Sequence, residues 1–282
     1  AGNIGASNFN NVTFSGSGTK TATDVLTIAG NVNISNNFTA GSFTHTVAGN
    51  WTKSGTFTAT GSTIDFNGSG AGNIGASNFN NVTFSGSGAK TATGALTIAG
   101  NVNISDNFTA GSFTHTVGGN WTKSGTFTPG TGTVIFDGTG SSSIGGITIF
   151  FNLTISKTGA GVATLSGIVI ASNNISVTLG TLDVSIFALT AAQTFSVSNG
   201  ATLLVGSAGN FPSAGTVTLE AASTVNYNRA GNQDISDQTY GHLTLSGSGT
   251  RSALGNVTLQ GGLTISGTAS FSLGSFDLTV TG

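Results

Sequence analysis

The chain has 282 residues and only 16 charged side chains, 7 basic and 9 acidic, with a formal net charge of -2. Gly (45), Thr (46), Ser (35) and Asn (27) make up more than half of it, and Cys and Met are absent. A hydrophobic content of 37% with so little net charge argues against intrinsic disorder. Seven dispersed cations argue against nucleic-acid binding. The lack of a long apolar run argues against membrane insertion, and the lack of Cys excludes disulfides and thiolate metal sites.

Short segments in which apolar and polar residues alternate recur from the N-terminus onward. Each is four to six residues long and ends in Gly, Asn or Ser; the first ones are 25–28, 31–35, 42–47 and 63–67. A period of two, with Thr, Val, Ile and Phe between turn residues, predicts short half-buried strands. Strong helix formers are scarce, so we expect an all-β fold with no helices.

A long internal repeat organises the chain. Residues 71–140 repeat residues 1–70 without a gap and with only 13 differences in 70 positions. A degenerate copy follows over 141–230 and a partial copy over 231–282. No linker separates the copies, so we expect one continuous domain over 1–282.

The tripeptide Ala-Gly-Asn suggests a shorter period inside the repeat. It occurs at 1–3, 29–31, 48–50 and 71–73. These spacings predict three turns of roughly 23 residues per long repeat, and thus a parallel β-helix (β-solenoid) of about 12 turns. A β-sandwich could also hold many short strands, but near-identical adjoining blocks with Gly at the corners favour the solenoid.

Paired carboxylates could make a β-helix a polysaccharide-cleaving enzyme. The only local pair is Asp234 and Asp237, near Arg229 and His242. No acidic residue is shared by the two close copies, and no Gly-Gly-x-Gly-x-Asp calcium turn occurs. We therefore expect a solvated corner at this pair, no catalytic residues, no metal and no cofactor.

Two aromatic residues recur with the 70-residue period. Trp51 and Trp121 each follow Gly-Asn, and we expect them to fill a wide corner of the core. The alternative is that they are exposed and stack on sugar rings. With Asp234 and Asp237 they complete the set of candidate surface or ligand contacts.

The other recurring side chains are assigned to the surface or to the core. His45 and His115 occupy Thr-His-Thr segments, and we expect both to face outward. Recurring lysines are expected to keep a charge-poor surface soluble: Lys20, Lys53, Lys90 and Lys123. Most of the recurring phenylalanines are expected to stack in the core: Phe9, Phe14, Phe38, Phe43, Phe57 and Phe66.

Two stretches carry a family resemblance. The run 119–140, GNWTKSGTFTPGTGTVIFDGTG, resembles the repeats of very large secreted bacterial β-strand-repeat surface proteins, of the filamentous-haemagglutinin-like and Bacteroidota-type adhesin kind. The run 226–236 together with 240–247 is similar to the same repeats. The resemblance implies a parallel β-helix at a cell surface that acts as a stalk, adhesin or fibre, and it implies no catalytic residues.

Together these observations predict a non-enzymatic extracellular solenoid, a stiff stalk or filament-forming protein of the bacterial cell surface. Its expected partners are itself, by end-to-end stacking or within a longer repeat array, and possible surface glycans or other cells. The first residues lack the features of a signal peptide, which fits a segment of a longer secreted chain. The alternatives are a carbohydrate-binding or carbohydrate-cleaving β-helix and, because of Thr-x-Thr runs, an ice-binding solenoid.

Overall fold

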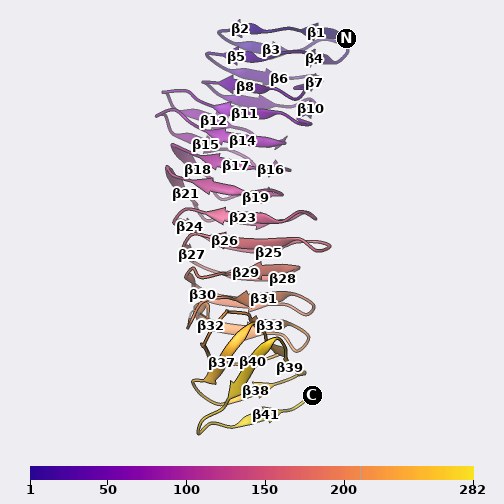
Figure 1. Ribbon diagram of the computed structural model, residues 1–282. Helices are drawn as coiled ribbons and strands as arrows, with labels where there is room; N and C mark the ends of the chain where they lie inside the picture. The colour runs from indigo at the N-terminus through magenta and orange to yellow at the C-terminus, as the bar shows by residue number, and fades with distance from the viewer. Residues whose placement is uncertain (210) are drawn as a thin grey trace. The chain divides into compact units, whose positions relative to one another are not determined.

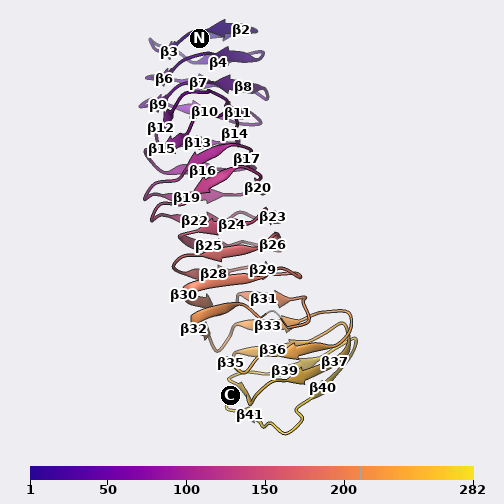
Figure 2. The ribbon, with the colours of Figure 1, turned by 90° about the vertical axis from the view of Figure 1, so that its left-hand side faces the viewer.

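The computed structural model describes residues 1–209 and 211–282. These residues form strands and turns and no helix, and their strands pair in parallel. Contacts divide the chain into two compact units, Ala1–Ile135 and Phe136–Gly282. Within each unit, successive turns of the chain stack to form a β-solenoid (Figures 1 and 2). The predicted fold class is therefore confirmed.

Unit 1 has three faces, one of which is formed by two successive sheets. The first face contains β2 (Ser7–Phe9), β5 (Leu26–Ile28), β8 (Thr44–Val47), β11 (Thr63–Phe66), β14 (Asn81–Phe84), β17 (Val102–Ile104) and β20 (Trp121–Lys123). The second contains β3 (Val12–Phe14), β6 (Val32–Ile34), β9 (Trp51–Lys53), β12 (Gly72–Ile74), β15 (Lys90–Ala92), β18 (Asn107–Thr109) and β21 (Thr126–Thr128). The third contains β1 (Gly2–Ile4), β4 (Lys20–Ala22), β7 (Phe38–Thr39) and β10 (Phe57–Thr58), and continues from β10 to β13 (Ser77–Phe79), β16 (Leu96–Ile98) and β19 (Thr114–Val117). Strand β22 (Thr133–Phe136) lies at the boundary of the units.

Unit 2 contains longer and less regular strands. One face contains β23 (Ser142–Gly145), β26 (Val162–Ser166), β29 (Thr181–Asp183), β31 (Thr202–Val205), β33 (Thr224–Tyr227), β36 (His242–Leu245) and β39 (Leu263–Ile265). A second sheet contains β24 (Thr148–Phe150), β25 (Asn152–Ser156), β27 (Val169–Ala171), β28 (Ile175–Leu179), β30 (Leu189–Val197) and β32 (Ser213–Leu219). Two three-stranded sheets follow, β34 (Gln233–Ile235), β37 (Ser248–Ala253) and β40 (Thr268–Ser272), and β35 (Thr239–Tyr240), β38 (Val257–Leu259) and β41 (Leu278–Val280).

The turns are shorter than the sequence spacing suggested. Gly2 is aligned with Lys20 in the next turn, and Val12 is aligned with Val32. The chain therefore makes about 15 turns, not about 12. The prediction was wrong because the tripeptide at 1–3 does not stack on the one at 29–31. Only the later spacings of 19 and 23 correspond to real turns, as the bonds from Gly49 to Gly30 and from Asn73 to Asn50 show.

The long repeat does not contain a whole number of turns. Residues 1–70 hold eleven strands, β1 to β11, and each turn uses three. Eleven is not a multiple of three, so one repeat makes three and two-thirds turns. Equivalent strands therefore move to a different face in the next copy. Strand β3 pairs with β6 on the second face, whereas its copy β14 lies between β11 and β17 on the first.

The core consists of columns of inward-facing side chains. Phe38 and Phe57 are aligned in successive turns, with ring centroids 5.7 Å apart, and Phe14 from another face stacks on Phe38 at 3.9 Å. In unit 2, Leu153, Ile175 and Phe195 are aligned in successive turns and are at most 1% exposed. Each such apolar side chain contributes about 1.5–3 kcal/mol through burial. The expected phenylalanine core is confirmed for most of the recurring positions.

Asparagine side chains link successive turns at one corner. The Oδ1 atom of Asn11 accepts a bond from the backbone N–H of Asn31 at 2.7 Å, and Asn31 accepts in the same way from Asn50 at 2.8 Å. The pattern recurs in the second copy, where Oδ1 of Asn81 accepts a bond from the backbone N–H of Asn101 at 2.8 Å. Each asparagine comes directly before the first inward residue of a strand. These bonds satisfy backbone groups that a corner would otherwise leave unpaired.

Candidate functional site

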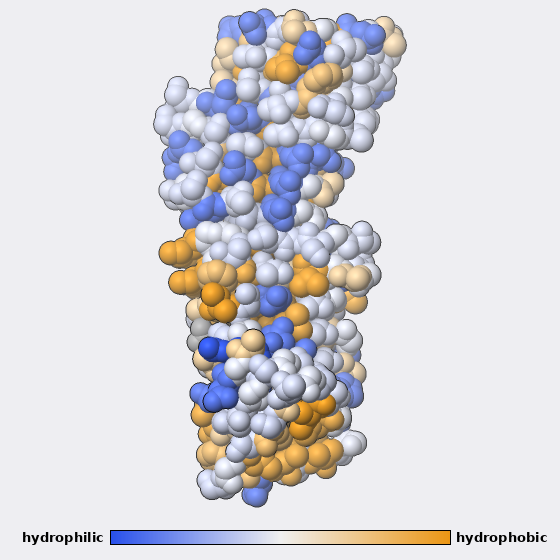
Figure 3. Space-filling view, viewed as in Figure 1, coloured by the Kyte–Doolittle hydropathy of each residue, from blue (hydrophilic) through white to orange (hydrophobic). Residues whose placement is uncertain are grey.

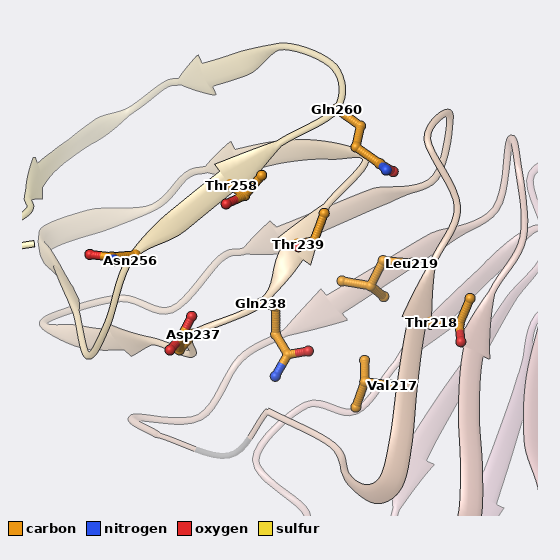
Figure 4. A pocket seen from close by; sticks show the side chains of 9 residues that line it. All are labelled: Val217, Thr218, Leu219, Asp237, Gln238, Thr239, Asn256, Thr258 and Gln260. Carbon is orange, nitrogen blue, oxygen red and sulfur yellow. The ribbon is translucent and has the colours of Figure 1, made fainter. Parts of the chain in front are cut away.

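Unit 2 contains an open groove of about 490 Å³ (Figure 4). Its walls come from the end of β32 on one side and from β35, β38 and the residues around them on the other. The lining side chains are Val217, Thr218, Leu219, Asp237, Gln238, Thr239, Asn256, Thr258 and Gln260. Amides and hydroxyls predominate, and Asp237 is the one charged group in this set.

The groove forms where the regular stacking of strands is interrupted. The segment that precedes β32 carries Phe211, whose ring lies 6.4 Å from the rings of Phe195, Tyr227 and Tyr240. Beyond β32 two new sheets begin. Asp234 of β34 donates its backbone N–H to Ala208 at 2.8 Å and does not bond to β32. The wall of the solenoid is therefore open between β32 and β35.

The two carboxylates of the predicted pair, Asp234 and Asp237, lie in different surroundings. Asp237 lines the groove, and Asp234 is exposed but not part of the lining. The neighbouring His242 uses Nδ1 to accept a bond from the N–H of Gly262 at 2.9 Å. Within 1–209 and 211–282, no group of three or more His, Asp or Glu side chains is arranged to hold a metal ion.

The two tryptophans are part of the core and are not surface contacts. Trp51 and Trp121 are 1% and 2% exposed. The indole of Trp51 lies 4.9 Å from the ring of Phe57, edge to face, and its Nε1–H donates to Ser77 at 2.8 Å. Trp121 packs against Phe127 in the same geometry. Both are therefore removed from the set of candidate ligand contacts, because no sugar ring can reach them.

The expectation that both histidines face outward was wrong. His45 and His115 are 2% and 4% exposed. Nε2 of His45 donates to Ala40 at 2.8 Å, and Nδ1 accepts from the N–H of Leu26 at 3.0 Å; His115 repeats both bonds. Burial lowers the pKa of each imidazole, which is neutral with this pair of bonds. The sequence does contain the signal, because Val47 faces inward and period two places His45 on the same side.

Three cations are buried, which the sequence reasoning missed. Lys90, Lys157 and Arg251 are each 0% exposed. The ammonium of Lys90 donates to the backbone oxygens of Gly68, Gly70 and Gly88 at 2.6, 3.3 and 2.6 Å. Burial lowers the pKa of both lysines and of Arg251. The assignment of Lys90 to a solubilising surface is therefore corrected.

The guanidinium of Arg251 lies in a cage of backbone carbonyls. It donates to the oxygens of five residues: Tyr227, Arg229, Gly231, Ser246 and Ser248. These residues belong to two successive turns, so one side chain ties the turns together. Two of the three buried cations share a sequence signal. Lys90 and Arg251 each follow Ser-Gly-Ser-Gly and one further residue, as does the half-buried Lys20, whereas Lys157 does not.

Comparisons with known proteins give no identification of the chain. No protein-family model matches it, and no curated protein and no solved structure is significantly similar. None of the residues that the structure describes forms a helix long and apolar enough to cross a membrane. The function is therefore proposed from the sequence and the solenoid structure.

Proposed function

We propose that this chain is a non-enzymatic structural or adhesive β-solenoid that serves as a stiff stalk or filament element on the outside of a bacterial cell. The observation that carries the proposal is the linkage of turn to turn throughout unit 1. Successive turns are joined by parallel strand pairing, by inward columns such as Phe38 on Phe57, and by the asparagine ladder. Bending such a stack requires many bonds to open together.

The outer surface supports this role. Outward positions of aligned strands are mostly filled by uncharged polar residues, as in the column of Asn8, Thr27 and Thr46, which Asp65 continues. The face in Figure 3 is accordingly mostly pale, with scattered hydrophilic spots and with larger hydrophobic areas in the lower half of the view. Because equivalent strands change face from copy to copy, the repeat does not build one special face. This argues against the ice-binding alternative, which needs a single regular array.

An apolar patch on unit 2 supports the adhesive part of the proposal. Ile147, Ile149 and Ile168 are 63%, 45% and 39% exposed, and Ile149 is aligned with Ile170 in the next turn. Strands β24 and β27 therefore carry isoleucine where the columns of unit 1 carry Thr or Asn. Contiguous exposed apolar surface of this kind is typical of contact sites.

The carbohydrate alternative loses its main support because both tryptophans are buried. The stalk proposal is tested by pulling the chain between two handles in an optical trap, with wild type compared with Asn101→Ala. Asn101 belongs to the ladder, and Asn103, whose side chain accepts only a 3.3 Å bond from Thr122, supplies the matched control Asn103→Ala. We expect a high unfolding force that falls in the Asn101 variant alone. A chain that extends at low force like a flexible coil would overturn the proposal.

The surface location needs its own test. Antibodies raised against the purified chain should label intact producing cells without permeabilisation. Labelling that requires permeabilised cells would refute the extracellular assignment and leave the mechanical result standing.

A further inference from the structure

Two strand edges face each other across the groove. Among the described residues, β32 is hydrogen-bonded only to β30, and β35 only to β38. The backbone groups of β32 and β35 that point into the groove are thus left for water or for a ligand.

The floor of the groove is the end of two core columns. Val217 and Leu219 are aligned with Phe195 and Val197 of the preceding turn. Phe195 and Val197 are 0% exposed and Leu219 is 6% exposed, whereas Val217 is only half-buried. A strand beyond β32 would continue both columns. A strand that filled this gap would therefore carry apolar side chains toward the interior and polar side chains toward the outside.

The groove is closed at one end and acidic toward the other. At the closed end the N–H of His242 donates to Ser223 at 2.7 Å, and Gly241 packs so tightly on Glu220 that a Cβ would overlap its backbone oxygen. Asp237 lies in the lining, and Asp234 is close by in the sequence. Arg251, on the strand next to β34, directs its guanidinium at backbone carbonyls and bonds to neither carboxylate.

We propose that the groove binds an extended polypeptide segment, inserted as an additional strand between β32 and β35. The segment runs parallel to β32 and is about three residues long, at the level of Thr216 to Thr218, because Glu220 and Gly241 close the groove just beyond Leu219. An apolar residue covers Val217, its polar residues face outward, and a Lys or Arg pairs with Asp237. Main-chain bonds supply the affinity, as in other cases of strand addition. This inference is independent of the stalk proposal.

The test uses the intact chain and three acetylated, fluorescein-labelled pentapeptides. Valine occupies the second and fourth positions, and a single lysine occupies the first, third or fifth, with threonine elsewhere. Each peptide is also made with N-methyl groups at positions two and four, and separately at position three. In a parallel strand these two sets of N–H groups point to opposite neighbours. Binding is measured by fluorescence anisotropy at low salt.

We expect at least one peptide to bind and both N-methylated forms to lose affinity about tenfold or more, since each removes main-chain bonds to one edge. Asp237→Asn should weaken binding and remove its salt dependence, while the matched control Asp24→Asn, an exposed acid of unit 1, should not. Loss with only one N-methylated set would refute insertion between two edges. Equal binding of the methylated peptides, no binding by any peptide, or binding of neutral oligosaccharides alone would overturn the proposal.

Discussion

Replacing Lys90 with Met isolates the contribution of a buried cation that bonds only to backbone oxygens. The side chain is 0% exposed, and its ammonium joins the corner of its own turn at Gly88 to the preceding turn at Gly68. Methionine keeps the length and apolar stem of the side chain but removes all three bonds. The carbonyls that lose their partner then remain in a largely dry corner.

The expected loss follows from these contacts. A bond to a charged group contributes about 1.5–3 kcal/mol, and an acceptor left buried without a partner costs a further about 1–3 kcal/mol. The variant no longer has to bury a charged ammonium, and the desolvation cost that it avoids offsets several kcal/mol of this loss. We therefore expect Lys90→Met to destabilise unit 1 by about 2–4 kcal/mol.

The first repeat copy supplies the matched control. Lys20 occupies the equivalent position, but it is half-buried and bonds only to Ser17 and Gly18, at 3.3 and 3.0 Å. Lys20→Met should cost about 0–1 kcal/mol, because water can replace these bonds. The two variants are compared by urea unfolding and by native-state hydrogen exchange of β15. Equal losses in the two variants, or no loss at Lys90, would refute the reasoning.

Two further predictions concern pH and backbone packing. Burial holds the pKa of His45 and His115 below the usual 6.5, so the unfolded chain takes up protons that the folded chain does not. The contribution of the neutral histidines to the free energy of unfolding should be fully present above about pH 6.5 and should be lost as the pH falls through the folded pKa. The urea midpoint should no longer depend on pH in this way in the double variant His45→Gln and His115→Gln. An unchanged dependence of the midpoint on pH in that variant would contradict the assignment. Gly125→Ala should cost about 2–4 kcal/mol, since a Cβ there overlaps the backbone of Asp106, whereas Gly5→Ala, with nothing within 4 Å, should change the thermal midpoint little. Similar midpoints for the two variants would mean that the turns stack differently.

The fold was predictable from sequence because alternation, punctuation and repetition all point the same way. Segments such as 31–35 alternate strictly, and Gly or Asn marks most corners, which favours a solenoid. The turn length was not predictable in the same way. The tripeptide Ala-Gly-Asn marks corners that are not all stacked on one another, and only the pairing of Gly2 with Lys20 shows this.

The buried polar side chains were missed for a different reason. Polarity suggested that His45 and Lys90 face solvent, although the inward phase of their strands places both in the core. Their partners are backbone carbonyls, which the alternation of side chains along a strand does not reveal. The groove also depends on the interruption after β32, and a single sequence shows only a loss of repetition there. Asp237 was identified as a candidate for its local pairing with Asp234, not for the groove it lines.

Cysteine crosslinking in the naturally cysteine-free chain tests most directly the central claim, which is that each short turn visits three faces and stacks on the next. Thr21 is aligned with Thr39, and in the second copy Thr91 is aligned with Thr109 on a different face. Strand neighbours lie about 4.8 Å apart, within reach of a disulfide. The account predicts that each of these two cysteine pairs oxidises readily, and that a pair at Thr21 and Thr44, which matches the longer spacing of the tripeptide, does not. Efficient crosslinking of the Thr21 and Thr44 positions in place of the other two pairs would contradict it.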